Sequence, residues 1–167
     1  MYDARRILKE LADDERRSRI LQSFWRNGDT SSKALATAQL ARALHFREQT
    51  LRKLPVKKKA ELLASRLGAH EFDQFFEMAL MQYHTHDLVE MLGAFLDLWN
   101  IPHVNGSIEV DDYPIPTPGQ VRDAVHQLEM RYEVRDIAVY LASAGLLMGG
   151  AWRESAWPVV DELAARP

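Results

Sequence analysis

Residues 70–103 read HEFDQFFEMALMQYHTHDLVEMLGAFLDLWNIPH, and this stretch decides the fold. Its apolar residues recur at the three- and four-residue spacing of two amphipathic helices, predicted over 71–84 and 88–99. At 100° per residue, the apolar stripe of the second helix lies roughly 140° from that of the first, so one straight helix cannot bury both. We therefore expect the chain to turn at 84–87, with Asp87 as the N-cap of the second helix.

Helical patterns dominate the rest of the chain as well. A helix is predicted over 3–26, with a polar middle at 13–19 that we interpret as a solvated face or a break, and another over 56–67. Residues 137–148 are apolar on nearly all sides, which predicts the central buried helix. The predicted fold is all-α, an irregular bundle of about seven helices that forms a single domain over residues 1–167.

A long proline-rich loop, residues 101–118, separates the helices of the two halves. Within it, Asn105 and Gly106 are typical of the tight turn in a short β-hairpin. Thr117 and Gln120 provide the N-cap and N3 pair of the helix that follows. Because long loops without regular structure are often functional, we expect a groove for a ligand or partner between this loop and the C-terminal segment.

Small and aromatic residues predict where the chain meets another protein. Gly145 and Gly149 share one face of the 137–148 helix with small alanines, a pattern that lets another backbone approach closely. Tryptophans in the same region are typical core or interface anchors. The predicted interface and groove residues are Trp99, Trp152, Trp157, Gly145 and Gly149. We expect the partner to be another protein or a second copy of the chain, in a homo-oligomer.

The net charge of −3 conceals two halves of opposite sign. The basic N-terminal part, residues 1–66, has 16 Lys and Arg against 8 Asp and Glu, whereas the acidic C-terminal part, residues 67–167, has 5 against 16. Such halves can dock on each other, associate head to tail between copies, or leave the basic half free for a polyanion such as nucleic acid.

Composition excludes several classes of function. There is no cysteine, so disulfides, thiolate metal sites and a cysteine nucleophile are excluded. The longest apolar stretch, 137–150, has 14 residues and is too short for a membrane span, and no apolar run follows the first residues, so we expect a cytoplasmic protein without a membrane partner. No phosphate-binding loop, nucleophile elbow or zinc-protease motif is present, which favours a non-catalytic protein without a cofactor.

The polar residues between the two central helices contain the ligand types of a transition-metal site. Imidazole and carboxylate groups suit zinc, iron or manganese. The candidate metal ligands are His84, His86, Asp87 and Glu90. The alternative is that Asp87 only caps a helix and that His84 lies on a solvated face at the end of the preceding helix.

The dyad His86-Asp87 in a helical protein resembles the HD-type metal phosphohydrolases. The resemblance implies a divalent transition metal and a hydrolytic reaction. It requires an upstream histidine, His45 or His70, and a later aspartate, Asp123 or Asp136. In that family an apolar residue precedes the dyad and a glycine-containing turn follows it, whereas here His84-Thr85 precedes it.

Residues 40–54, LARALHFREQTLRKL, resemble the helix-turn-helix of bacterial DNA-binding regulators. The positions that pack the two helices together are taken by Ala41, Phe46, Leu51 and Leu54. The resemblance implies that five side chains face DNA: Arg47, Gln49, Thr50, Arg52 and Lys53. His45 stands where the family prefers glycine at positive φ. The alternative is one continuous helix over about 33–53, because its residues are good helix formers.

Three functions remain open on the sequence alone. The first is a non-catalytic helical module that binds a protein or associates with itself. The second is a DNA-binding regulator that uses residues 40–54. The third is a metal-dependent hydrolase at His84, His86 and Asp87.

Overall fold

The computed structural model describes residues 1–166 and confirms a mostly helical chain, with ten α-helices in this range instead of about seven. The helices are α1 (Ala4–Arg6), α2 (Asp14–Asn27), α3 (Thr30–Leu44), α4 (Glu48–Lys53), α5 (Val56–Ala64), α6 (Asp73–Gln82), α7 (Val89–Leu98), α8 (Pro118–Leu128), α9 (Val134–Met148) and α10 (Gly150–Ala164). Shorter helical turns occupy Ile7–Leu11, His70–Phe72 and Tyr83–Asp87. Strands β1 (His103–Val104) and β2 (Ser107–Ile108) form one antiparallel hairpin.

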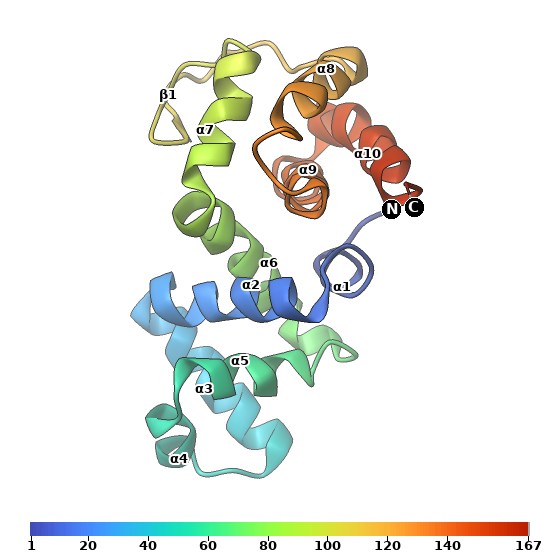
Figure 1. Cartoon of the computed structure of the whole chain (residues 1–167). Helices are drawn as coiled ribbons and strands as arrows, with labels where there is room; N and C mark the ends of the chain where they lie inside the picture. Colours follow the sequence, from blue (N-terminus) through green and yellow to red (C-terminus); the bar gives the residue numbers. More distant parts are fainter. Residues whose placement is uncertain (167) are drawn as a thin grey trace.

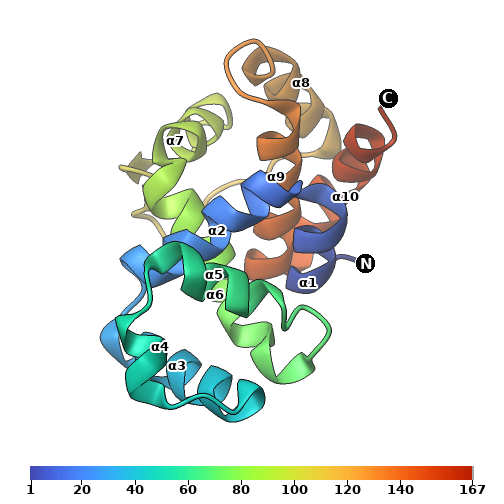
Figure 2. The same cartoon turned by 60° about the horizontal axis from the view of Figure 1, so that its bottom comes forward.

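Two helices, α2 and α6, cross in the middle of the molecule and separate its two ends. Helices α3, α4 and α5 lie on one side of this crossing, and α7 to α10 lie on the other (Figures 1 and 2). The N-terminal segment lies against α10, where the hydroxyl of Tyr2 donates to Asp161 at 2.6 Å. None of the helices described here is long and apolar enough to cross a membrane.

The turn predicted at 84–87 is a π-helical turn over Tyr83–Asp87, so the chain remains helical through the corner. The amide of Leu88 donates to the carbonyl of Tyr83, five residues earlier, at 2.9 Å. The extra residue in this turn rotates the apolar face of α7 relative to that of α6, which reconciles the two stripes. The prediction that Asp87 caps α7 is wrong, because its carboxylate instead accepts hydrogen bonds from Ser23 and Arg26 of α2.

The hairpin and the start of α8 are confirmed. Asn105 and Gly106 have positive φ angles of 49° and 80°, and a Cβ on Gly106 would lie 2.8 Å from Leu92, so glycine is required there on both counts. Thr117 and Gln120 form the reciprocal capping box at the start of α8.

Two segments that the sequence allows to be continuous are broken. The segment predicted over 3–26 divides at Ala12 and Asp13, where Asp13 becomes the N-cap of α2 and accepts from the amide of Arg16 at 2.8 Å. The 33–53 segment divides at His45, which takes the left-handed conformation (φ 56°, ψ 36°). One continuous helix over 33–53 is therefore excluded, and two helices joined by a short turn take its place.

Helix α9 is buried along most of its length, as predicted, and α10 packs against it. A Cβ on Gly145 would lie 2.4 Å from Nε1 of Trp157, so the small side of α9 is the surface that receives α10. Helix α10 begins at Gly150 and contains Pro158 in its interior.

Candidate functional site

The side chains of the turn Tyr83–Asp87 lie in different surroundings. Tyr83 and His84 are buried, whereas His86 is exposed. The hydroxyl of Tyr83 donates to Asp136 at 3.3 Å, and the carboxylate of Asp87 bonds to α2. The prediction of a solvated face for His84 is wrong, because the turn rotates its ring into the core, where only 5% of the residue is exposed.

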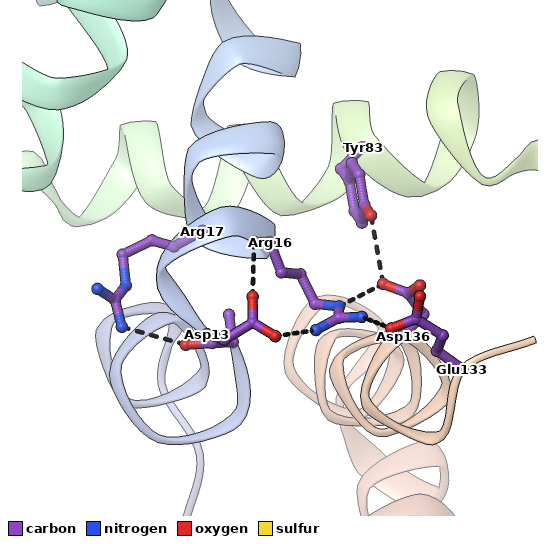
Figure 3. A network of polar contacts seen from close by, with 7 residues as sticks. Asp13, Arg16, Arg17, Tyr83, Glu133 and Asp136 are labelled. Atoms are coloured by element: carbon purple, nitrogen blue, oxygen red, sulfur yellow. Dashed lines mark hydrogen bonds and ion pairs between the residues drawn. The ribbon is translucent and has the colours of Figure 1, made fainter.

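The buried guanidinium of Arg16 lies close to this turn (Figure 3). Arg16, on α2, is only 1% exposed. It donates through Nε to Asp136 at 2.5 Å, through one terminal nitrogen to Asp13 at 2.6 Å, and through the other to Glu133 at 2.5 Å. Asp136 also accepts a hydrogen bond from the hydroxyl of Tyr83, so this one carboxylate connects α2, α9 and the Tyr83–Asp87 turn. Of the two alternatives for residues 13–19, the break occurs at Asp13, whereas a solvated face is wrong at Arg16, which is buried.

The charges in this network stabilise each other. Burial alone would lower the pKa of Arg16, but the hydrogen bonds and charges of its carboxylate partners, Asp136 first, raise that pKa above its ordinary value. Burial and the charge of Asp136 raise the pKa of Tyr83, so its phenol stays protonated. A permanently charged guanidinium and a neutral phenol cannot exchange a proton with a substrate at neutral pH, and we interpret the network as structural.

His84 has a defined protonation state. Its Nδ1 lies 2.7 Å from the carbonyl oxygen of Leu80, and because a carbonyl only accepts hydrogen bonds, Nδ1 carries the proton. Burial lowers the pKa of His84 to about 4, so the ring is neutral at pH 7. Nε2 is then an acceptor, and it is buried without a hydrogen-bond partner in the described part of the chain.

The predicted metal ligands do not converge. His84 bonds to a carbonyl in the core, while Nδ1 of the exposed His86 lies near the Thr85 hydroxyl and the Gln82 carbonyl. Asp87 is engaged by Ser23 and Arg26, and Glu90 is exposed on α7. Within residues 1–166, no group of three His, Asp or Glu side chains is arranged to hold a metal ion.

Of the alternatives that the phosphohydrolase resemblance allows, one aspartate and one histidine are engaged elsewhere. Asp136 is bonded to Arg16, and His70 lies beside Arg5 and Asp73. These contacts give both residues structural partners, and we derive no hydrolytic site from them.

The segment that resembles a helix-turn-helix forms two helices separated by a turn. The amide of Phe46 donates to the carbonyl of Ala41 at 2.9 Å, the bond that closes a helix ending in a left-handed residue. Histidine tolerates this conformation better than most non-glycine residues. Ala41 and Leu51 are buried and Leu54 is partly buried, whereas Phe46 is 49% exposed, so its predicted role in packing the two helices is wrong.

All five predicted DNA-facing residues lie on the surface. They come from the start of α4 and from its exposed sides, and they are Arg47, Gln49, Thr50, Arg52 and Lys53. Leu51 alone anchors this six-residue helix in the core. Arg52 pairs with Glu48 at 3.3 Å, so part of its charge is neutralised.

The predicted groove and interface residues are mostly used for internal packing. Trp157 donates to the carbonyl of Ala142 at 3.2 Å and covers Gly145, while Gly149 joins α9 to α10. Trp99 and Trp152 pack edge to face with ring centroids 5.5 Å apart. The small-residue face of α9 is therefore occupied by α10 of the same chain.

Comparison with known proteins adds no assignment. No protein-family model matches the sequence, and no curated protein or solved structure matches it. We therefore infer function from the geometry of this chain.

Arg16 escaped the sequence prediction although a signal for it exists. Arg16, Ile20 and Phe24 are spaced four residues apart, which places the arginine on the buried face of α2. The charged residues on either side of Arg16 make this four-residue spacing hard to recognise in the sequence. A charged residue that continues an apolar stripe is a candidate for a buried ion pair.

We predict that Arg16→Met lowers the free energy of unfolding by about 3 kcal/mol or more, because it leaves the Asp136 carboxylate buried without its main partner. Adding Asp136→Asn to that variant should restore part of the loss, since the amide is neutral and still accepts from Tyr83. Urea denaturation measures both values. Arg19→Met, at an exposed position on α2, is the control and should cost about 0.5 kcal/mol or less. Equal costs at positions 16 and 19 would contradict the network's role.

We also predict that His84 makes the protein less stable in mild acid. Between its ordinary value of 6.5 and its folded pKa of about 4, the unfolded state binds a proton that the folded state does not. The contribution of His84 to the free energy of unfolding is therefore at its maximum above pH 6.5, and it falls by about 3 kcal/mol as the pH is lowered towards 4. Urea denaturation of the wild type and of His84→Asn across this range isolates the effect.

The two stability curves should differ by an amount that changes with pH. In His84→Asn the amide keeps the hydrogen bond to Leu80 but does not titrate, so its stability should fall less. His86→Asn, at the exposed histidine of the same turn, should behave as the wild type does. Parallel curves for the wild type and His84→Asn would show that His84 is not held neutral.

Proposed function

We propose that the protein binds duplex DNA through its basic lobe, defined as residues 30–66 with helices α3, α4 and α5. The observation that carries this proposal is the break at His45, which gives the segment two helices and a turn and exposes the outward side of α4. One continuous helix over about 33–53 would have excluded a helix-turn-helix in this segment.

The charge of the basic lobe supports a polyanionic partner. Residues 30–66 contain 9 Lys and Arg and 2 Asp and Glu, a net charge of +7, so the remainder of the chain carries −10. Both acids are already paired within the lobe, Glu48 with Arg52 and Glu61 with Lys58. Six cations have no carboxylate within 4.0 Å in residues 1–166: Lys33, Arg42, Arg47, Lys53, Lys57 and Lys59. Phosphates can neutralise such cations and release counterions.

Self-docking of the two halves accounts for cations outside the lobe, since Arg5, Arg16 and Arg26 pair with acids of residues 67–167. It does not account for the charge of the lobe itself. Only Arg66, at the edge of the lobe, has such a contact, with Glu71 at 3.8 Å, among the residues described. The lobe also lies beyond the α2 and α6 crossing, away from α8 to α10 (Figure 2).

The side chains of α4 divide into two roles. Arg47 and Lys53 are positive and exposed at its two ends, which suits phosphate contacts on either side of the helix. Gln49 and Thr50 are neutral, exposed and able to donate and accept, which suits contacts to base edges. We therefore propose that α4 faces a groove of the duplex and that the cations around it bind the backbone.

Fluorescence anisotropy of a labelled mixed-sequence duplex, titrated at several salt concentrations, tests the proposal. The wild type should bind, and its affinity should fall steeply as salt is raised. Arg47→Gln with Lys53→Gln should weaken binding and reduce the slope of log affinity against log salt by about 2, because each lost phosphate contact contributes about 0.9. The melting temperature should be unchanged, since both side chains are exposed.

Arg19→Gln with Arg131→Gln provides the matched control. It makes the same change in net charge at exposed positions outside the lobe and should leave the salt slope unchanged. Loss of binding in both double variants to the same extent would show that overall charge alone acts. No binding by the wild type at low salt would contradict the proposal directly.

A further inference from the structure

A cavity of about 390 Å³ lies on the other side of the molecule from the basic lobe, between α7, α9 and the hairpin. Leu92 and Leu96 of α7 form one wall, Tyr140 and Ala144 of α9 form another, and Ile108 of the hairpin contributes as well. Volumes of about 300 to 1,000 Å³ are usual for small-molecule sites. Of the residues predicted for a groove, only Trp152 lines this cavity.

Two of the residues that line the cavity each carry a buried ring nitrogen without a hydrogen-bond partner. Nε2 of His84 is an acceptor, because the ring's proton is on Nδ1 and is donated to Leu80. Nε1 of Trp152 is a donor, and neither atom has a hydrogen-bond partner anywhere in the described chain. Leaving a buried polar atom without a partner is unfavourable, so such atoms are usually satisfied by water or by a ligand.

The remaining lining restricts the chemistry of an occupant. None of the residues that line the cavity, within the part of the chain described, carries a charge, and His84 is neutral. Burial raises the pKa of Tyr140, so its phenol is neutral too. A charged ligand would lose its hydration without gaining a counter-charge, which favours an uncharged one.

The rim of the cavity is apolar and exposed. Met81, Leu147 and Met148 line it and are 41%, 42% and 49% exposed. Large apolar side chains grouped at a cavity in this way mark a surface that gains from being covered. Methionine side chains are flexible and adapt to occupants of different shape.

We propose that this cavity binds a small, uncharged, largely apolar molecule that carries a hydroxyl or N–H group, and that this group donates a hydrogen bond to Nε2 of His84. The apolar body of the ligand contacts Leu92, Leu96 and the exposed rim. An acceptor on the ligand serves Nε1 of Trp152. The site is independent of the basic lobe, so the two proposals stand or fall separately.

The test compares two probes that differ in one donor. 1-Naphthol carries a hydroxyl, and 1-methoxynaphthalene has the same ring system without a donor. Calorimetric titration of the full chain should show about tenfold tighter binding of 1-naphthol, the effect of one hydrogen bond. In His84→Asn, whose shorter side chain keeps the bond to Leu80 but has no acceptor at the position of Nε2, the two probes should bind about equally.

A second pair of variants tests the location. Ala144→Phe fills the cavity from α9 and should abolish binding of both probes, whereas Ala151→Phe, at an exposed position on α10, should have no effect. Melting temperatures identify any variant that fails to fold. A preference for 1-naphthol that survives in His84→Asn, undiminished binding in Ala144→Phe, or no binding of either probe to the wild type would overturn the proposal.

Discussion

The ion pair between Arg16 and Asp136 is the interaction on which the arrangement of the helices around the central turn depends. It joins α2 to α9 at 2.5 Å, and Asp136 also binds the hydroxyl of Tyr83. Because Tyr83 and His84 are consecutive in a π-helical turn, fixing the first side chain on Asp136 directs the second towards the cavity wall. A buried ion pair contributes little net stability compared with apolar packing, but it tolerates no loss of one partner. In this chain the main effect of the ion pair is to fix the positions of α2, α9 and the Tyr83–Asp87 turn relative to one another.

Much of the architecture follows from local sequence rules, and the exceptions have identifiable causes. The hairpin at Asn105-Gly106 and the Thr117/Gln120 capping box are local signals, and both occur as predicted. The rotation between the two central helices was also readable from their apolar stripes. Whether it is made by a break or by a π-helical turn depends on the contacts of Asp87 with Ser23 and Arg26, which are more than 60 residues away in sequence. Such long-range contacts are not visible in one sequence.

The candidate sites were only partly predictable for the same reason. His45 fits a positive-φ position less well than glycine, and the helix propensities of its neighbours favour one continuous helix. The break is decided by the fold, in which His45 takes the left-handed conformation and Leu51 is buried in the core. His84 looked like a surface residue because its neighbours are polar, yet the π-helical turn rotates it inward. The cavity combines residues from α7, α9, α10 and the hairpin, and no local pattern brings them together. The long loop and the tryptophans indicated only its neighbourhood.

The protonation state of His84 is the most direct point at which to test this account. Nitrogen NMR spectra of isotope-labelled protein distinguish the two neutral imidazole tautomers from the charged ring. The account predicts that His84 is neutral with its proton on Nδ1 at pH 7, and that it remains so until the pH approaches 4. A ring protonated on Nε2, or one that becomes charged near pH 6.5, would contradict the geometry of the turn and remove the acceptor from the cavity.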